Sequence, residues 1–361
     1  MHRRSFIKGA GIAAAAATTV AAPAIAQSMP KVSWRLTSSY PKSLDTLYGI
    51  STHLSKRIAE ITDGNFTIQP FAAGELVGGL QALDAVQEGT IECAHTLSSF
   101  YIGKDPAFQF DTSLPFGLNT RQHIGWLYYG GGRELVNEFL GGYNIHAIPA
   151  GNTGAQMGGW YRKEINSLAD LNGLKMRIAG MGGTIMSRLG VVPQQIAGGD
   201  IYSALERGTL DAAEFSGPYD DEKLGFYKVA KYYYAPGWWE GTANASLYIN
   251  KDKWASLPPA YQAALETVSS ETMSHCLAKY DANNPEALYR LVGQGTELRV
   301  FPQEVLDAGY NASREVYAEY AASNPAFKKM YDQWSAYTEK QRVWNRLAEL
   351  PFDGFLAGKT Q

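Results

Sequence analysis

Two segments of the chain carry the same pattern, and this repeat constrains the fold more than any other feature. Residues 83–94 (LDAVQEGTIECA) and 202–213 (YSALERGTLDAA) lie about 120 residues apart. Each predicts an amphipathic helix, a glycine suited to its C-terminal end (Gly89 and Gly208), and a short strand that begins with threonine, an apolar residue and an acid. Two copies are too few for a solenoid. They predict two similar α/β lobes, and a cleft between lobes is a preferred position for small-ligand sites.

The flanking segments indicate the same class. Residues 32–36 alternate as a half-buried strand does, 47–58 have helical apolar spacing, and 66–71 predict a second strand. A strand, a helix and a strand in succession form a βαβ unit, which implies parallel pairing. Beyond residue 258 the sequence predicts four helices, over residues 261–280, 285–292, 302–323 and 325–347. We therefore expect a two-lobed α/β protein with parallel or mixed sheets, an interlobe cleft and long C-terminal helices.

The lobes are assigned by residue range. Lobe I is expected to contain residues 31–150 and about 241–280, and lobe II residues 151–240 and about 281–330. The C-terminal helix, 331–361, has an apolar and aromatic stripe. Such a stripe either packs in the core or forms a contact in a homodimer, because exposed apolar stripes mark interfaces.

The N-terminus, residues 1–26, is typical of a twin-arginine export signal. Arg3 and Arg4 precede an apolar stretch over 9–20 and a small-residue cleavage site at 24–26. The predicted location is therefore the periplasm, where the absence of ATP argues against phosphoryl transfer. With 32 Lys and Arg against 35 Asp and Glu, the chain lacks the basic excess of nucleic-acid-binding proteins. Its two cysteines, Cys93 and Cys276, have no zinc spacing and form no disulfide scaffold.

Arg177 and Glu214 are the strongest candidate ligand-binding residues. Arg177 lies in a strand expected to be nearly buried, and its planar guanidinium matches a carboxylate in two places. A structural ion pair with Asp170 or Glu214 explains it equally well. Glu214 follows the second repeated strand, where ligands of α/β sheets gather, and its carboxylate with amide and backbone oxygens suits Na⁺ or Ca²⁺. The neighbouring acids 220–222 point in different directions, so solvation or capping is the better explanation for them.

The sequence does not support a dinucleotide site, a histidine metal site or a hydrolase triad. Residues 180–185 (GMGGTI) follow a strand and open a helix, but the third glycine of a dinucleotide fingerprint is Ile185. What remains is a glycine-rich helix N-terminus beside Arg177, a natural place for an anionic group. The histidines form no metal-binding pair and no nucleophile elbow occurs, so a hydrolase triad has no support.

Several longer runs resemble one known family. They are residues 151–160 (GNTGAQMGGW), 173–177 (GLKMR), 191–202 (VVPQQIAGGDIY), 217–226 (GPYDDEKLGF) and 236–241 (PGWWEG). Together they resemble the extracytoplasmic solute receptors of tripartite ATP-independent periplasmic (TRAP) transporters, in the branch that binds 2-oxoacids with a metal ion. The resemblance implies a non-enzymatic receptor that delivers a monocarboxylate, such as pyruvate or a longer homologue, to the membrane subunits of a permease.

The resemblance also implies roles for individual residues. Arg177 would bind the substrate carboxylate, Gln156 both substrate and metal, and Glu214 the metal together with the backbone carbonyl of Phe215. The cation would be Na⁺ by preference, or Ca²⁺. Glu240, Asn152 and Tyr101 complete the candidate substrate-binding residues.

Some positions depart from the family pattern. Phe215 stands where this branch tends to have tryptophan, and residues 98–102 and 242–245 are also atypical. A smaller wall would favour a longer or differently branched acid. Two other functions stay open at this point: a metal-dependent periplasmic enzyme with Glu214 as base, and a sensor that presents its closed form to a signalling partner.

Overall fold

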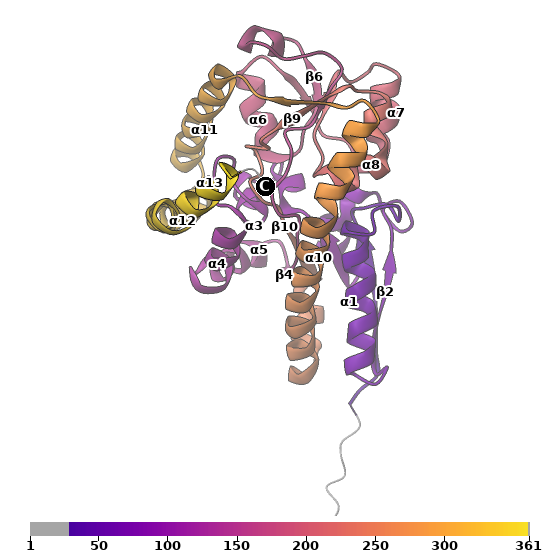
Figure 1. Ribbon diagram of the computed structural model, residues 1–361. Coiled ribbons are helices and arrows are strands. Elements are labelled where there is room, and N and C mark those ends of the chain that lie inside the picture. Colours follow the sequence, from indigo (N-terminus) through magenta and orange to yellow (C-terminus); the bar gives the residue numbers. More distant parts are fainter. Residues whose placement is uncertain (1–28, 360–361) are drawn as a thin grey trace, which may run out of the picture.

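Two separate β-sheets form the centres of two lobes in the computed structural model, which describes residues 29–359 (Figure 1). The predicted export signal, residues 1–26, lies outside the described part of the chain. The predicted two-lobed α/β class with long C-terminal helices is confirmed. The residue boundaries predicted for the lobes stay predictions.

The sheet of lobe I has the strand order β2-β1-β3-β10-β4. Strands β2, β1 and β3 are parallel, and β10 is antiparallel to both of its neighbours. The strands are β1 (Val32–Ser38), β2 (Phe66–Phe71), β3 (Cys93–Thr96), β4 (Ile145–Asn152) and β10 (Asn244–Asn250). Every residue of β10 is buried, as expected of a strand with neighbours on both sides.

The sheet of lobe II has the order β11-β9-β5-β8-β6-β7 and is also mixed. Its strands are β5 (Trp160–Tyr161), β6 (Lys175–Arg177), β7 (Val192–Gln194), β8 (Ala212–Ala213), β9 (Tyr232–Ala235) and β11 (Glu297–Val300). Strand β6 lies between β8 and β7 and is parallel to both. This position buries the last residue of β6, Arg177, inside the lobe.

Helices cover the sheets of both lobes. Those of lobe I are α1 (Leu47–Ile61), α2 (Ala82–Gln87), α3 (Gln109–Thr112), α4 (Thr120–Tyr129), α5 (Gly132–Gly141) and α9 (Lys251–Ser256). Those of lobe II are α6 (Gly180–Arg188), α7 (Ile201–Glu206) and α8 (Pro218–Leu224). Helix α1 buries Leu47, Ile50, Leu54 and Ile58, so the apolar spacing that predicted the helix also defines its core-facing side.

The repeated segments fold as the pattern predicted, with one correction. The helices α2 and α7 are followed by Gly89 and Gly208, which have φ of 75° and 73°, a left-handed conformation that glycine adopts without strain. The strands after them begin at Cys93 and Ala212, three residues later than predicted. The intervening residues form a turn, because their backbone returns to the preceding helix: the amides of Thr90 and Thr209 bond to carbonyls of α2 and α7.

A single long helix connects the two lobes. Helix α10 (Pro259–Gly293) packs on α1 and β4 in lobe I and on α8 in lobe II (Figure 1). The sequence predicted two helices divided near Pro285, and this is wrong, because Pro285 lies inside the continuous helix. A proline removes the hydrogen bond to the carbonyl four residues earlier and its ring crowds that carbonyl, but packing along both lobes keeps the helix continuous.

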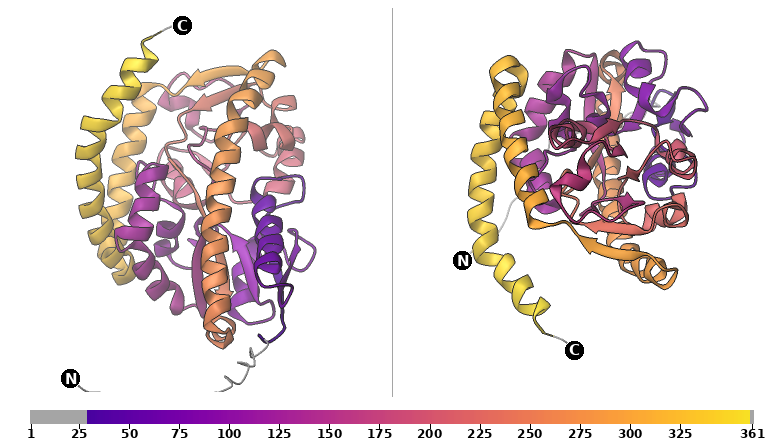
Figure 2. Two further views of the ribbon diagram at one scale, coloured as in Figure 1. Left: turned by 60° about the horizontal axis from the view of Figure 1, so that its bottom comes forward. Right: turned by 90° about the horizontal axis from the view of Figure 1, so that it is seen from above.

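Three helices close the chain along one side of the molecule (Figure 2). Helix α11 (Gln303–Ser323) packs on α6 of lobe II, and α12 (Pro325–Ala348) packs on α4 and α5 of lobe I. A further helix, α13 (Leu350–Ala357), continues from α12. Within the described residues, none of the helices combines the length and the apolarity needed to cross a membrane.

Candidate functional site

A small cavity lies between the lobes at the carboxyl ends of their strands. The space left between its side chains is small, about 10 Å³, which is close to what a single water molecule needs. Tyr40 follows β1, Leu97 follows β3, Arg177 ends β6 and Glu214 follows β8. The remaining lining residues are Leu47, Phe100, Thr153, Gln156, Ala179, Phe215, Ser216 and Glu240. Open α/β sheets place ligands at this edge, so the topology itself selects this position for a site.

Arg177 bonds to Glu214 and keeps one nitrogen, Nη2, without a hydrogen-bond partner among the described residues. It is 2% exposed, and its Nη1 donates to Glu214 Oε1 at 2.6 Å and to the Glu214 carbonyl oxygen at 2.7 Å. Its Nε donates to the Ile196 carbonyl oxygen at 3.3 Å. No acceptor within residues 29–359 bonds to Nη2. The ion pair that the sequence offered as an alternative therefore exists with Glu214, while Arg177 also lines the cavity and its Nη2 has no partner among residues 29–359.

Asp170, the other acid considered as a partner for Arg177, has a different role. Its Oδ2 accepts hydrogen bonds from the backbone amides of Asn166 and Ser167, both at 2.9 Å. These bonds form a capping box at the start of a short 3₁₀ helix, Leu168–Leu171. Asp170 therefore stabilises the start of its own short helix and does not pair with Arg177.

Glu214 is held by the start of α6 as well as by Arg177. Its Oε1 accepts a hydrogen bond from the Ala179 amide at 2.9 Å, at the N-cap of the helix. The carboxylate therefore occupies the anion-favouring position that the glycine-rich segment predicted. Burial raises the pKa of Glu214, and the positive charge of Arg177 opposes that rise.

Glu240 is a second buried acid on the cavity wall. It is 6% exposed, and its pKa is raised to about 8, first by burial and then by the neighbouring charge of Glu214. Arg177, Gln156 and Ser99 act in the opposite direction. One arginine thus faces two carboxyl groups, and the balance favours a proton on Glu240 near neutral pH.

Several buried polar atoms around the cavity lack a hydrogen-bond partner among the described residues. Gln156 donates from Nε2 to Thr153 Oγ1 at 3.1 Å, but its Oε1 accepts nothing. The same is true of Tyr40 Oη and Ser216 Oγ, which also line the cavity. Buried polar groups in proteins are nearly always paired, so unpaired ones gathered at one cavity indicate a site that a polar ligand completes.

The donor set suits a hard cation. Among residues 29–359 there is no group of three His, Cys, Asp or Glu side chains arranged to bind a metal. Gln156 Oε1, however, has no partner among the described residues, and Gln156 lines the same cavity as Glu214 and Phe215. Amide, carboxylate and carbonyl oxygens fit Na⁺ or Ca²⁺ and not zinc.

Two of the residues predicted for the site lie outside the cavity lining. Asn152 is 1% exposed, and its Oδ1 accepts from the Gly154 amide and from Thr242 Oγ1, both at 2.8 Å. It therefore shapes the loop that carries Gln156. Tyr101 bonds through its hydroxyl to Thr96 Oγ1 at 2.8 Å inside lobe I. Its neighbour Phe100 lines the cavity instead, because the two side chains diverge on the 3₁₀ turn Ser98–Tyr101.

Three polar residues of the cavity lining, Tyr40, Thr153 and Ser216, were not predicted from the sequence. Tyr40 had a usable signal, since it follows the first strand of lobe I as Glu214 follows the repeated strand of lobe II. Applying the strand-end rule to both lobes would have found it. Thr153 and Ser216 are small polar residues in loops, and no spacing distinguishes them.

The predicted solvation of the acids at 220–222 is wrong for two of them. Asp220 and Asp221 are buried and not solvated. Asp220 accepts from Thr46 and Tyr280, and Asp221 accepts from Trp160 at 2.9 Å and Tyr233 at 2.8 Å. Because the side chains do point apart, as predicted, they serve two different structural networks and form no metal cluster.

Hydrogen bonds also join the lobes directly across the cavity. The Met181 amide of α6 donates to Gln109 Oε1 of α3 at 2.9 Å. Gln195 Nε2 of lobe II donates to the Phe100 carbonyl oxygen of lobe I at 2.8 Å. Both bonds require the lobes to be in contact, so the structure represents a closed arrangement.

The family follows from a match over most of the chain. The model for bacterial extracellular solute-binding proteins, family 7, matches residues 37–324. The chain belongs to this family. A monocarboxylate 2-oxoacid-binding periplasmic protein from Nostoc sp. is 49% identical over 98% of this chain and 99% of the relative. The predicted resemblance is confirmed, and the protein is a solute-binding protein of the TRAP type and not an enzyme.

Solved structures agree in fold. A TRAP transporter solute-binding protein from Bordetella bronchiseptica, a dimer with calcium and picolinate in one site, is 54% identical with a TM-score of 0.90, covering 91% of this chain and 97% of that one. A TRAP solute-binding protein from Pseudoalteromonas atlantica, with bound sodium and pyruvate, is 35% identical with a TM-score of 0.87, covering 91% and 100%.

Proposed function

We propose that the protein binds one small monocarboxylate, a 2-oxoacid such as pyruvate or a longer homologue, together with Na⁺ or Ca²⁺ in the interlobe cavity. It then delivers this solute to the membrane subunits of a TRAP permease. The observation that carries the proposal is the set of unpaired buried polar atoms beside Arg177, because a buried anion with a cation would pair both the donors and the acceptors.

Each residue has a part in this proposal. Arg177 offers Nη2 to the solute carboxylate while Nη1 stays on Glu214. Gln156 Oε1, the Glu214 carboxylate and the Phe215 carbonyl oxygen hold the cation. The cation supplies positive charge that offsets the repulsion between Glu214 and an anionic solute. A protonated Glu240 donates a hydrogen bond and adds no further negative charge.

Related proteins support the chemistry. The Nostoc relative is named for binding monocarboxylate 2-oxoacids, and the Pseudoalteromonas protein holds pyruvate with sodium. The Bordetella protein holds picolinate, a ring-bearing carboxylate, with calcium. All three are named for a carboxylate ligand, and the two solved structures also hold a calcium or sodium ion. We favour Na⁺ for this chain, with Ca²⁺ as the other candidate.

Isothermal titration tests the proposal. Purified protein is titrated with pyruvate and with longer 2-oxoacids, in sodium-free buffer and with added NaCl or CaCl₂. We expect binding that strengthens when either cation is present. If none of the acids binds under any of these conditions, the proposal is wrong. Lactate and propionate are matched controls. Lactate has a hydroxyl on its second carbon, which ligates a cation less well than the keto oxygen of pyruvate. Propionate has no oxygen on that carbon.

We also propose export by the twin-arginine route, on the paired Arg3 and Arg4. The family is extracellular in its description, which is consistent with a periplasmic location. In a bacterial host, the double substitution Arg3→Lys, Arg4→Lys should leave uncleaved precursor in the cytoplasm. Cleaved periplasmic protein from that variant would exclude this route.

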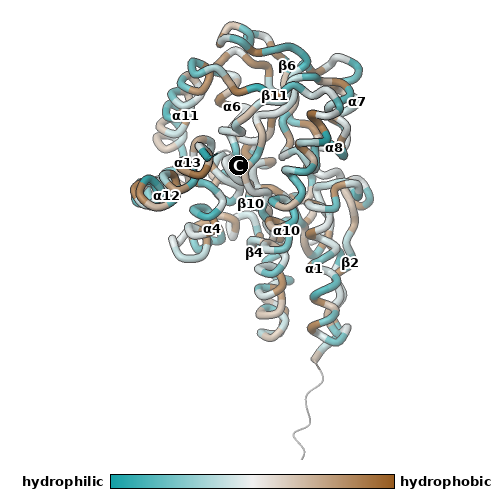
Figure 3. Tube along the Cα trace, viewed as in Figure 1, coloured by the Kyte–Doolittle hydropathy of each residue, from teal (hydrophilic) through white to brown (hydrophobic). Residues whose placement is uncertain are grey.

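We further propose that the C-terminal helices form a homodimer contact. Brown, apolar patches run along α12 and α13 (Figure 3). The exposed fractions are 58% for Trp344, 74% for Leu347 and 62% for Phe355. Large exposed apolar patches mark interfaces, and the Bordetella structure is a dimer.

Light scattering during size-exclusion chromatography tests this contact. The wild type should elute with the mass of a dimer, and the double substitution Trp344→Glu, Leu347→Glu with that of a monomer. Tyr129→Glu, at a residue that is 96% exposed on α4, is the matched control and should stay dimeric. A monomeric wild type at micromolar concentration would contradict the proposal.

A further inference from the structure

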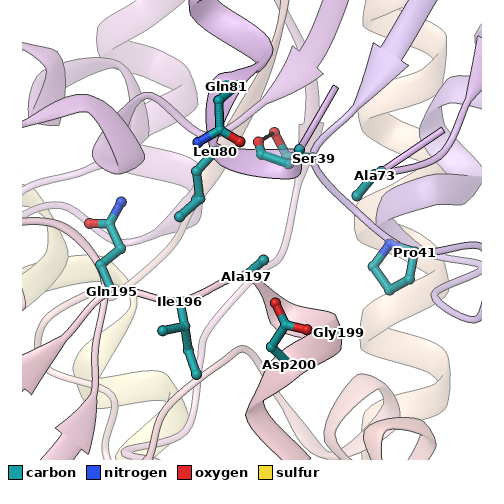
Figure 4. Close-up of a pocket in the computed structure, with 13 residues that line it drawn as sticks. Ser39, Pro41, Ala73, Leu80, Gln81, Gln195, Ile196, Ala197, Gly199 and Asp200 are labelled. Carbon is teal, nitrogen blue, oxygen red and sulfur yellow. Dashed lines mark hydrogen bonds between the residues drawn. The ribbon is translucent and has the colours of Figure 1, made fainter. Parts of the chain in front are cut away.

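The two lobes do not meet evenly along the interlobe cleft. In one part of it they face each other across a cavity of about 490 Å³ that is open to solvent (Figure 4). Lobe I lines this cavity from the segments 39–41 and 73–81, and lobe II lines it from the segment 195–200. The closed arrangement therefore depends on contacts in other parts of the cleft.

Beside α10, lobe I and lobe II are bonded directly through their side chains. Asp45 accepts hydrogen bonds from Lys223 and from Tyr219 Oη, the latter at 3.1 Å. Its neighbour Thr46 donates from Oγ1 to Asp220. Asp45 and Thr46 precede α1 of lobe I, and their three partners belong to α8 of lobe II. Because residues 219 and 223 are four apart in a helix, they lie on the same face and can meet one acceptor.

Helix α10 contributes to the same group of residues. Lys279 Nζ donates to Asp45 Oδ2 at 2.7 Å and to the Asp45 carbonyl oxygen at 2.8 Å, and Tyr280 Oη donates to Asp220. Each of the two acids is therefore bonded both to α10 and to the opposite lobe. Burial opposes ionisation of Asp45, but hydrogen bonds from Lys223 and Lys279 lower its pKa to about 2, so it is charged near neutral pH.

The lobe I part of this contact is continuous with the wall of the binding cavity. Tyr40 and Leu47 line the cavity, and residues 45–46 lie between them in the chain. The Leu44 amide donates to the Pro41 carbonyl oxygen at 3.1 Å, so the segment is folded as a compact turn. A short turn of this kind moves as a unit, and the position of the cavity wall is therefore linked to the contact with α8.

The contact combines an exposed ion pair with a buried hydrogen bond. The side chains of Asp45 and Lys223 are 50% and 24% exposed, and exposed ion pairs contribute little stability each. Asp220, in contrast, is fully buried. Because the partners belong to different lobes, separation of the lobes pulls them apart. A contact of modest strength can thus favour the closed state and still allow it to open.

We infer that residues 45–46 and the facing residues of α8 form an interlobe latch, which favours the closed state after the solute has bound and slows solute release. This inference rests on the proposed function and goes beyond it, because it assigns the residence time of the solute partly to residues outside the solute site. A contact that exists only in the closed state shifts the population toward that state.

A double-mutant cycle tests the latch. Pyruvate release in saturating NaCl is measured by stopped-flow tryptophan fluorescence for Asp45→Asn, for Lys223→Gln and for the double variant. Each single variant should release pyruvate about twofold to fivefold faster than wild type, as for loss of an exposed ion pair. The double variant should release it no faster than Asp45→Asn, because the two residues share one contact. Lys223→Arg keeps the charge and should release pyruvate at nearly the wild-type rate.

The possible outcomes separate the latch from the proposed function. If the variants bind pyruvate and release it at the wild-type rate, the latch is wrong and the proposed function stands. Effects that multiply in the double variant would show that Asp45 and Lys223 act independently, which also overturns the latch. Slower association with unchanged release would place the contact in the open state and overturn it as well. If wild-type protein binds no 2-oxoacid, both the proposed function and the latch are wrong.

The matched control is an exposed ion pair between α1 and α10. Arg57 Nε donates to Glu271 Oε1 at 2.8 Å, and these side chains are 34% and 40% exposed, comparable to those of the latch. This pair lies where α10 packs on lobe I and does not involve α8. The double substitution Arg57→Gln, Glu271→Gln should therefore leave the release rate unchanged. Faster release from this control would attribute the effect to a general loss of surface ion pairs and overturn the latch.

Discussion

Two groups of buried acids in this molecule differ in whether their hydrogen bonds are complete. Asp111 of lobe I is 3% exposed, and its carboxylate accepts from Ser246 at 2.9 Å, Asn244 at 3.1 Å and Tyr248 at 3.2 Å. Glu214 and Glu240 are buried to a similar degree, but unpaired polar atoms surround them.

The completeness of the hydrogen bonds distinguishes structural from functional burial. A buried acid with its full set of neutral donors is compensated within the fold, as Asp111 is. The interlobe cavity has two carboxyl groups, one arginine with a free Nη2 and an unpaired Gln156 oxygen, so its compensation must come from outside the chain. Removing a residue should therefore cost stability in the first group and binding in the second.

The largest effect is expected from Arg177→Ala. The variant removes the donor for the solute carboxylate, and truncating one partner of a buried charged contact costs about 2–5 kcal/mol. We expect pyruvate affinity to fall at least about thirtyfold in calorimetry, with Arg290→Ala unchanged as a control for loss of a surface charge. Undiminished binding by folded Arg177→Ala would place the carboxylate elsewhere.

Asp111→Ala should act on stability instead. The change leaves Ser246, Asn244 and Tyr248 without their common acceptor, and unpaired buried groups destabilise a fold by about 2–3 kcal/mol in total. Urea unfolding should show this loss, while titration of the folded variant should give pyruvate affinity within about twofold of wild type. A variant with normal stability and impaired binding would reverse the distinction between the two groups.

The two groups of acids should also differ in how they make stability depend on pH. Folded pKa values of about 8 for Glu240 and about 6 for Asp111 lie above those of the unfolded chain, so both acids stabilise the fold at low pH. That contribution is lost as pH rises, up to about pH 6 for Asp111 and about pH 8 for Glu240. Each group should contribute a slope of about 1.4 kcal/mol per pH unit at most.

Urea titrations of ligand-free protein between pH 5 and 9 measure these slopes. Glu240→Gln should flatten the curve between pH 6 and 8, because it removes the titrating group that acts there. Asp111→Asn should flatten it below pH 6 and leave the upper part unchanged. Identical curves for wild type and Glu240→Gln would show that Glu240 titrates normally.

The sequence predicted those features that depend on local pattern or on a strand end. Gly89 and Gly208 end their helices because left-handed backbone favours glycine, which is a local requirement. Arg177 and Glu214 lie together because adjacent parallel strands β6 and β8 end at the same edge. Such features follow from periodicity and topology alone.

Other features depend on tertiary contacts and could not be predicted. Which of Phe100 and Tyr101 faces the cavity is decided by how a 3₁₀ turn packs on lobe I. The continuity of α10 through Pro285 depends on its contacts with both lobes. The burial of Asp220 depends on Thr46 and Tyr280, residues from distant segments that no local pattern links.

The smallest expected effect concerns the contact between the lobes. Gln109 Oε1 accepts the Met181 amide across the cleft, and an added Cβ at Gly180 would lie 2.7 Å from that oxygen, so the lobes meet closely here. A bond that exists only in the closed state stabilises that state relative to the open one. Gln109→Ala should therefore speed solute release about twofold to fivefold and leave association unchanged, as for loss of one neutral hydrogen bond.

Stopped-flow tryptophan fluorescence measures both rates. Gln122→Ala is the matched control, because Gln122 belongs to a capping box on exposed α4 and makes no bond to lobe II. Its release rate should equal that of wild type. If Gln109→Ala also releases the solute at the wild-type rate, closure must be held by the ligand, Gln195 and the latch without this contact. The carboxylate site and these remaining contacts would then account for the retention of the solute. The Gln109–Met181 contact would in that case be structural, as the hydrogen bonds of Asp111 are.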